Sequence, residues 1–280
     1  MKFENIRVFN FENALRGMRN PLESWHLSDS KFGIYDSDNA WEVAEEMIYI
    51  HKREIAKQNN SDEVISVSDK EIKDYMKNMV LYHDDDMYEI AAIGPKDMNL
   101  AQRLIRGGPE HRKFLRQIMI TVDITAPLYW WKEADTYAIG VTKNSTSTMH
   151  KLASKPITLE CFEIDDYNPE IYDDNADPLL QKLDIDAHIK EDLLPFFELL
   201  RQKYLETNDK RYWKELVRWL PNGWLQTRTV TMNYENILSI CHQREHHKLT
   251  EWSGMGENES FMKFARSLPY ANDLIFINDN

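Results

Sequence analysis

The residues best placed to bind an anion surround position 233. Asn233 follows the Thr-rich stretch Trp224 to Met232 and precedes an apolar, helix-like stretch. A strand that feeds a helix at an Asn cap leaves backbone amides and polar side chains at one rim, and phosphates and polar rings bind at such rims. Asn233 therefore has two interpretations: a ligand contact, or solely the cap of the helix that follows.

Two histidines one helical turn apart, His242 and His246, have a spacing that suits a shared metal ion. The residue after the first is Gln243, where a metalloprotease helix carries glutamate, and no third ligand is evident. Cys161 and Cys241 lie far apart and form no CxxC pair. The sequence therefore predicts no metal site and no disulfide framework, and it favours a reducing cytoplasm.

Aromatic side chains gather in the segment from Leu128 to Tyr137. Trp130, Trp131 and Tyr137 could stack on a planar ring, but an aromatic-rich helix more often packs in a core or at a subunit interface. Neither GxGxxG nor a P-loop pattern occurs anywhere in the chain.

The elements that must position these residues are a mixture of strands and helices. Strands are predicted at the alternating N-terminus and at 117–125 and 224–232. Helices are predicted at 40–57 and 97–106, from about Pro109, after Pro127, at 189–205 and 211–220, and from Asn233. The acidic run 84–86 is typical of a solvated turn.

Composition limits the classes of partner. With 280 residues, 42% of them hydrophobic and 29% charged, the chain has an ordinary globular balance, and no segment is apolar enough to span a membrane. The N-terminus lacks the apolar core of a signal peptide. A formal net charge of -13 disfavours broad binding to nucleic acid polymers, whereas a single nucleotide needs only a few placed cations. We therefore expect a soluble, cytoplasmic protein with no membrane partner.

We predict a single domain over residues 1–280 with an acidic excursion at about 163–186. That segment is the most acidic part of the chain and contains Pro169 and Pro178. A linker between two independent domains is the alternative. The single-domain interpretation is preferred because the motifs on either side belong to one site in the resemblance described next.

From Gly107 to Leu152 the sequence resembles the flavin-dependent thymidylate synthase family (ThyX). That family has a histidine in a turn, an apolar strand ending in proline, an RHR motif with a serine downstream, and then Lys-Leu. His111, Pro127 and Lys151-Leu152 fall in this order.

A second block is similar to the same family. There, an arginine on a helix precedes Leu-Pro, a Thr-rich strand follows, and an asparagine begins a helix that carries an arginine eleven positions later. Arg218, Leu220-Pro221, Asn233 and Arg244 match this order. Together the two blocks cover roughly half of the chain.

The resemblance implies roles for individual residues. For the deoxynucleotide it implies Arg244, Arg218, Lys143, Thr146, Ser147 and Thr148, and for the flavin it implies His111, Thr136, Tyr137, Asn233 and Ser239. Arg244 would reach the phosphate or base of a deoxyuridylate-like ligand. Its alternative is a surface ion pair with Glu245 or Glu251, and that of His111 is a capping or solvent-exposed histidine.

The sequence departs from the family at several of these positions. Thr136, Tyr137 and Ala138 stand where the family has Arg-His-Arg. An arginine fork holds a phosphate bidentately, whereas a hydroxyl offers one directional bond and no charge. Thr146 stands for the family's serine and Thr148 for an arginine, although the polar run 144–148 could cradle a phosphate, with Lys143 supplying charge.

Two further departures lie in the second block. Glu235 stands where the family usually has arginine, and Ser239 where it has asparagine.

The resemblance implies an α+β fold, an antiparallel sheet packed with helices, in a homotetramer. It implies a methyltransferase of dTMP biosynthesis that moves a one-carbon unit from methylenetetrahydrofolate to C5 of dUMP or a related deoxynucleotide. FAD would be the cofactor and NADPH a co-substrate. Because the flavin carries the reactivity in such chemistry, no protein nucleophile is assigned.

Other interpretations stay open. The substrate or the one-carbon donor could have changed while the flavin is kept. A non-catalytic nucleotide-binding or regulatory protein could have kept the scaffold and Arg244 but lost the flavin with the RHR motif. An interaction protein without either ligand would make the polar run 144–148 an ordinary surface loop.

Overall fold

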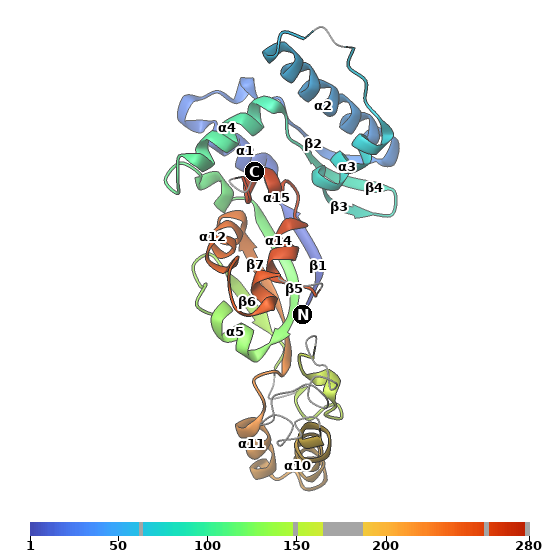
Figure 1. Cartoon of the computed structure of the whole chain (residues 1–280), viewed down its shortest axis with the longest axis vertical. Coiled ribbons are helices and arrows are strands. Elements are labelled where there is room, and N and C mark those ends of the chain that lie inside the picture. Colours follow the sequence, from blue (N-terminus) through green and yellow to red (C-terminus); the bar gives the residue numbers. More distant parts are fainter. Residues whose placement is uncertain (62–63, 148–150, 165–186, 255–257, 278–280) are drawn as a thin grey trace, which may run out of the picture. The chain divides into compact units, whose positions relative to one another are not determined.

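A computed structural model describes residues 1–61, 64–147, 151–164, 187–254 and 258–277. Its strands are β1 (Lys2–Phe9), β2 (Lys31–Asp36), β3 (Val80–Asp84), β4 (Met87–Ala92), β5 (Met119–Pro127), β6 (Thr142–Ser145) and β7 (Leu225–Asn233) (Figure 1). The longer helices are α1 (Phe11–Met18), α2 (Ser37–Gln58), α3 (Asp69–Met79), α4 (Pro95–Arg106), α5 (Leu128–Ala134), α10 (Leu194–Thr207), α11 (Lys210–Trp219) and α12 (Tyr234–Arg244). Short helices α13 (Thr250–Ser253), α14 (Phe261–Arg266) and α15 (Ala271–Leu274) follow. The predicted α+β class is confirmed.

The strands form two sheets. One has the order β1-β5-β7-β6. The other has the order β2-β4-β3, with both strand pairs antiparallel and Gly33 opposite Ile90 in the register. The predicted turn at 84–86 joins β3 to β4, and Asp85 adopts a left-handed conformation there.

The contacts of the chain divide it into two compact units. Unit 1 comprises Met1–Lys2, Asp123–Thr136 and Lys143–Thr229, and unit 2 comprises Phe3–Val122, Tyr137–Thr142 and Val230–Asn280. A single domain over 1–280 and a homotetramer both stay predictions. Residues 165–186 of the acidic excursion lie outside the described residues.

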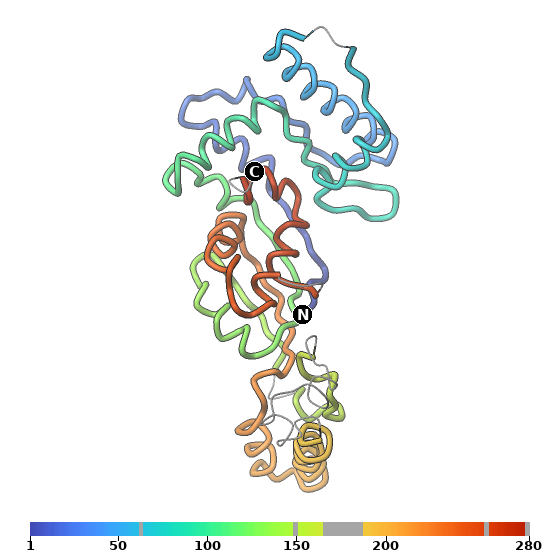
Figure 2. The backbone as a smooth tube through the Cα atoms, viewed as in Figure 1, coloured from blue at the N-terminus to red at the C-terminus, as the bar shows by residue number. Residues whose placement is uncertain are grey.

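Unit 2 joins the two ends of the chain around an aromatic core. The rings of Phe3 and Phe264 stack at 4.6 Å, and Phe11 meets the edge of Tyr234 at 5.5 Å. Figure 2 shows the red segment that contains α14 beside the first strand, in blue. The buried Tyr234 hydroxyl donates to the carbonyl of Pro269 at 2.7 Å, and this contact fixes the start of α12.

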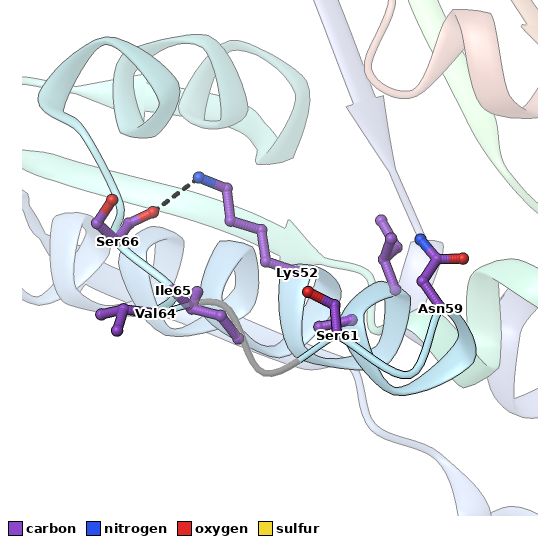
Figure 3. Close-up of a pocket in the computed structure, with 8 residues that line it drawn as sticks. Lys52, Asn59, Ser61, Val64, Ile65 and Ser66 are labelled. Carbon is purple, nitrogen blue, oxygen red and sulfur yellow. Dashed lines mark hydrogen bonds between the residues drawn. The ribbon is translucent and has the colours of Figure 1, made fainter.

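The long helix α2 covers the three-stranded sheet of unit 2 and packs on α3. Asp36 caps α2, and a reciprocal pair of bonds between Ser68 and Glu71 caps α3. Lys52 reaches from α2 to the carbonyl of Ser66 at 2.7 Å (Figure 3). Lys52 also pairs with Glu71. Lys52 lines a cavity of about 370 Å³, and its charge is already neutralised by Glu71.

Unit 1 has a separate core at the helix pair α10 and α11. Leu152, Ile157, Phe162, Phe197 and Leu216 form this cluster. Hydrogen bonds from Arg201, and then from the backbone N–H of Ile157, lower the pKa of Glu198 to about 2. These bonds attach the segment before Phe162 to α10.

Several predicted boundaries differ from those in the structure. The helix expected from about Pro109 is a turn followed by a 3-10 helix at Lys113–Arg116, because Gly108 adopts a left-handed conformation there. The helix expected at 189–205 begins as a π-helix at His188–Leu193 and becomes α-helical at Leu194. The stretch that precedes the predicted turn at 84–86, for which no element is predicted above, contains α3 and also β3.

Candidate functional site

The strongest cluster of predicted site residues lies in unit 2, at the end of α12. The Nε atom of Arg244 donates to the Tyr137 hydroxyl at 2.7 Å. The guanidinium lies 5.5 Å from the centre of the Tyr137 ring and 5.2 Å from that of Trp252. The two rings meet edge to face at 6.2 Å. Stacking of this kind fixes the plane of a guanidinium and leaves it charged.

Trp252 is a member of this cluster that sequence reasoning missed. Its side chain is buried and packs on Phe261 at 5.4 Å and on His247 at 6.5 Å. A buried tryptophan on the short helix α13 gives no periodic signal, because four residues are too few to show one. We refer to Tyr137, Arg244 and Trp252 as the arginine clamp.

Ser239 is connected to Tyr137 of the arginine clamp by the side chain of Gln243. The Gln243 amide donates to the Ser239 hydroxyl at 3.0 Å and accepts from the Tyr137 hydroxyl at 3.4 Å. Ser239, Gln243 and Arg244 share one end of α12 because residues four or five positions apart lie on neighbouring turns. The structure thus brings together three residues that the resemblance singled out: Tyr137, Ser239 and Arg244.

Asn233 has the structural role foreseen for it. Its side chain accepts from the N–H of Asn236 at 2.9 Å, and the Asn236 side chain accepts in return from the N–H of Asn233 at 3.1 Å. Asn236 also donates to the carbonyl of Ile139 at 2.9 Å. The cap of α12 therefore holds the loop that begins with Tyr137.

Gly140 completes this loop contact. Its φ of +73° suits glycine, and a Cβ there would lie 3.2 Å from the Asn233 amide nitrogen. The exposed Ile139 precedes it, with 92% of its side chain accessible. Asn233 and Tyr137 are thus linked through the backbone of one loop.

His111 lies on a different turn of unit 2. It is exposed, and its ring packs beside Gly107, where a Cβ would approach it to 3.2 Å. The next residue, Arg112, makes a two-bond pair with Glu235 at 2.9 and 3.1 Å. Both of these side chains are largely buried, with exposures of 16% and 14%.

The pair explains the charge reversal at position 235. Where the family that the sequence resembles usually has an arginine, this chain has an acid that is neutralised by Arg112 of the His111 turn. A bidentate guanidinium-carboxylate pair saturates both partners. Position 235 is therefore a structural contact here, and it does not supply a cation for a ligand.

In unit 1, Lys143 of β6 is largely buried and already engaged. Its ammonium donates to the carbonyl of Ala134 at 2.7 Å and lies 3.3 Å from Asp135. Arg228 of β7 pairs with the same carboxylate at 2.8 Å and stacks on Trp131 at 4.2 Å. Sequence reasoning missed Arg228, although a lone cation in a Thr-rich strand was a usable signal.

Thr136 and Thr146 also lie in unit 1. The Thr136 hydroxyl donates to the carbonyl of Glu133 at 2.7 Å and closes the end of α5. The backbone of Thr146 bonds with Thr227 and with the Gln226 side chain. The carbonyl of Ser147 accepts from the N–H of Lys151, and Thr148 lies outside the described residues.

Arg218 is half exposed on α11 and pairs with Glu215 at 2.6 Å. The Trp219 indole donates to the same carboxylate at 3.0 Å. This arrangement is an ordinary surface ion pair one turn apart on a helix. No described contact joins Arg218 to the arginine clamp.

Four of the five residues at the flavin positions, all except His111, can be tested against the chemistry of FAD. The hydroxyl of Thr136 and the polar groups of Tyr137, Asn233 and Ser239 already bond to other parts of the chain. None of the four is a cation, whereas a diphosphate is best held by permanent cations or free amides. These four residues therefore do not fit the phosphates of FAD.

Two further features concern the described residues alone. The described residues contain no group of three or more His, Cys, Asp or Glu side chains arranged to hold a metal ion. The absence of a metal site stays a prediction. His246 is almost fully exposed beside Glu245. None of the described helices combines the length and the apolar character needed to cross a membrane.

Comparison with known proteins gives matches among solved structures only. No protein-family model matches the chain, and no curated protein matches it. Two crystal structures of the flavin-dependent thymidylate synthase ThyX from Helicobacter pylori with FAD and dUMP are similar in fold. One match covers 88% of this chain and 96% of that chain, with 14% identity and a TM-score of 0.45. The other covers 90% and 98%, with the same identity and TM-score.

Proposed function

We propose that this protein binds a pyrimidine deoxynucleotide such as dUMP and acts as a thymidylate synthase-like enzyme, transferring a one-carbon unit to C5 of the base. The observation that carries the proposal is the arginine clamp. Arg244, the residue that the sequence resemblance assigns to the nucleotide, has its guanidinium oriented by Tyr137 and Trp252.

The clamp suits recognition of a phosphate or a pyrimidine carbonyl. A guanidinium offers five donors in a fixed plane, and a stacked one loses little conformational entropy when it binds. The cap at Asn233 fixes the loop that carries Tyr137, so that both sides of the contact are attached to α12. The proposed role of Arg244 is to bind and orient the nucleotide.

The cofactor and co-substrates of the proposal are FAD, NADPH and methylenetetrahydrofolate. They rest on the sequence resemblance alone, because the residues at positions 136, 137, 233 and 239 are neutral and bonded within the chain.

A second candidate function follows from the same neutral residues. A nucleotide-binding or regulatory protein without flavin needs Arg244 but needs no cation at positions 136–138. The hydroxyls of Thr136 and Tyr137 already make hydrogen bonds within the chain, which favours this candidate. It shares the nucleotide with the enzyme proposal and differs from it in the cofactor.

Visible absorption of the purified protein separates the two candidates. The protein would be incubated with excess FAD, desalted, and then supplied with dUMP, methylenetetrahydrofolate and NADPH. The enzyme proposal predicts flavin bands that stay with the protein and a product methylated at C5. A colourless protein that still binds dUMP would contradict the enzyme proposal and support the second candidate.

A further inference from the structure

A cavity of about 540 Å³ lies in unit 2, on elements other than those of the arginine clamp. Its walls come from the segment after α1, from the last turns of α2 and from one face of α4. The volume is within the usual range for small-molecule sites. The residues that matter here are Arg19, Leu22, Leu27, Lys96, Leu100 and Arg103.

The cationic wall of this cavity is a single face of α4. Lys96, Asn99, Leu100 and Arg103 are spaced by three, four and seven positions, so that their side chains project from the same side of the helix. Two cations, an amide and an apolar side chain therefore line the same wall.

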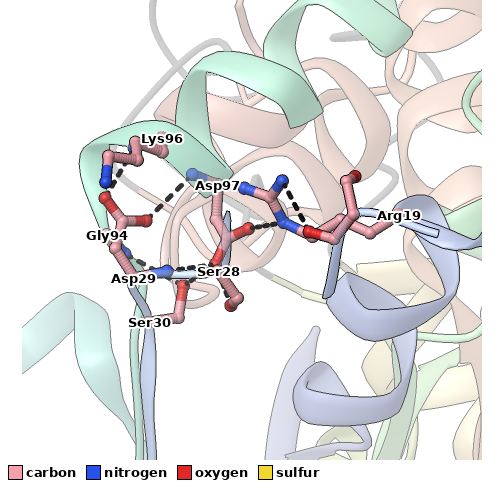
Figure 4. A network of polar contacts seen from close by, with 8 residues as sticks. Arg19, Ser28, Asp29, Ser30, Gly94, Lys96 and Asp97 are labelled. Atoms are coloured by element: carbon pink, nitrogen blue, oxygen red, sulfur yellow. Dashed lines mark hydrogen bonds and ion pairs between the residues drawn. The ribbon is translucent and has the colours of Figure 1, made fainter. Parts of the chain in front are cut away.

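Arg19, which lines the cavity, belongs to a buried ion pair with Asp97 (Figure 4). Arg19 donates to Asp97 at 2.6 Å, and the side chains are only 5% and 0% exposed. The Asp97 carboxylate also accepts from the hydroxyls of Ser28 and Ser30, both at 2.6 Å. The charge of Arg19 is thereby balanced, and its guanidinium forms part of a fixed wall.

The acid that lines the cavity is also balanced. Glu54 pairs with Lys57 at 2.9 Å, and this hydrogen bond is the main cause that lowers the pKa of Glu54. The positive charge of Lys96, which also lines the cavity, lowers the same pKa further. Glu54 is thus already neutralised by its own helix.

Two positive charges of the cavity lining remain to be considered, those of Lys96 and Arg103. Among the residues that the structure describes, neither the ammonium of Lys96 nor the guanidinium of Arg103 makes a hydrogen bond or an ion pair. The backbone amides at the start of α4 cannot supply the binding, because Asp29 already accepts from the N–H groups of Lys96 and Asp97. Any anion here would be bound by the two side chains.

We propose that this cavity binds a small dianion with an apolar body, such as a phosphate monoester or a dicarboxylate. Lys96 and Arg103 match the two negative charges, and Leu22, Leu27 and Leu100 provide the apolar surface. Two unneutralised cations in one hollow stand out in a chain whose formal net charge is -13. The site is independent of Arg244.

Calorimetric titration tests the proposal with two probes, phenyl phosphate and phthalate, which separate phosphate from carboxylate recognition. The wild-type protein is expected to bind at least one of them, more weakly at higher salt. Arg103→Gln should weaken that binding about tenfold, because one charge-assisted contact is lost. The double change Lys96→Gln with Arg103→Gln should abolish it.

Arg106→Gln is the matched control, since Arg106 lies on the same helix, is exposed and does not line the cavity. Arg106→Gln should bind the probe like the wild type, and Arg244→Ala should keep the binding event that Arg103→Gln weakens. Absence of binding by the wild type would overturn the proposal. An equal loss in Arg103→Gln and Arg106→Gln, or a loss confined to Arg244→Ala, would also overturn it.

Discussion

At the scale of single residues, Arg244 combines a hydrogen bond with two aromatic contacts. Arg112, Arg218, Arg228 and Lys143 all contact carboxylates. Arg244 bonds to a phenol oxygen and lies against two aromatic rings. A phenol and two rings orient a guanidinium and fix its plane, which is the geometry that a phosphate or a pyrimidine carbonyl requires.

Tyr137→Phe tests the hydroxyl of the clamp. The change removes the acceptor 2.7 Å from Arg244 Nε and keeps the ring. We expect dUMP affinity to fall by about 1 kcal/mol, the usual value of one hydrogen bond, in calorimetric titration. Tyr82→Phe is the control, because the Tyr82 ring also carries a stacked arginine, Arg7. An unchanged affinity in Tyr137→Phe would show that the hydroxyl does not position Arg244.

The sequence predicted two of the three residues of the arginine clamp. Arg244 and Tyr137 were both singled out, but they are 107 positions apart and no local pattern predicts that they touch. Trp252 was missed because burial on a four-residue helix leaves no periodicity. The partner of Glu235 was missed because the ion pair with Arg112 spans 123 positions.

At the scale of elements, α12 connects the fold to the candidate site. Its first residue, Tyr234, is buried, its cap holds the loop at 139–140, and its last residue is Arg244. The sequence predicted this helix and its asparagine cap because both are local signals. The strands 117–125 and 224–232 were predicted nearly as observed for the same reason.

Local signals failed where tertiary contacts decide the structure. Gly33 lies within β2, where it supplies no side chain, and β3 has a register shift between Val80 and Tyr82, so that neither sequence shows regular alternation. The three-stranded sheet was therefore not foreseen. At His188–Leu193 the helix is wound as a π-helix, which no periodicity of 3.6 residues predicts.

Substitutions of Asn233 separate its two roles. Asn233→Ala removes the cap and should lower the free energy of unfolding by about 1 kcal/mol in urea denaturation. Asn233→Asp keeps a capping oxygen and should leave stability near that of the wild type. If Asn233 also contacts the ligand, Asn233→Asp will lose dUMP affinity although it stays stable. Asn272→Ala, at an exposed asparagine, is the control. Full stability of Asn233→Ala would contradict the capping role.

At the scale of the whole molecule, the predicted site residues divide between the two units. Tyr137, Asn233, Ser239, Arg244 and His111 belong to unit 2, and Thr136, Lys143, Thr146, Ser147 and Arg218 belong to unit 1. The clamp is complete within unit 2, so that binding by Arg244 can be tested without reference to unit 1.

The most direct test of the account is calorimetric titration of dUMP into the wild type, Arg244→Ala and Arg266→Ala. Arg266 is the matched control, because it is a second stacked arginine of unit 2, 4.0 Å from the Phe276 ring. We predict equal affinity for the wild type and Arg266→Ala, and a loss of about 1 to 3 kcal/mol in Arg244→Ala, as expected for one charge-assisted contact. Equal dUMP affinity in all three proteins, or no binding by the wild type, would contradict the account.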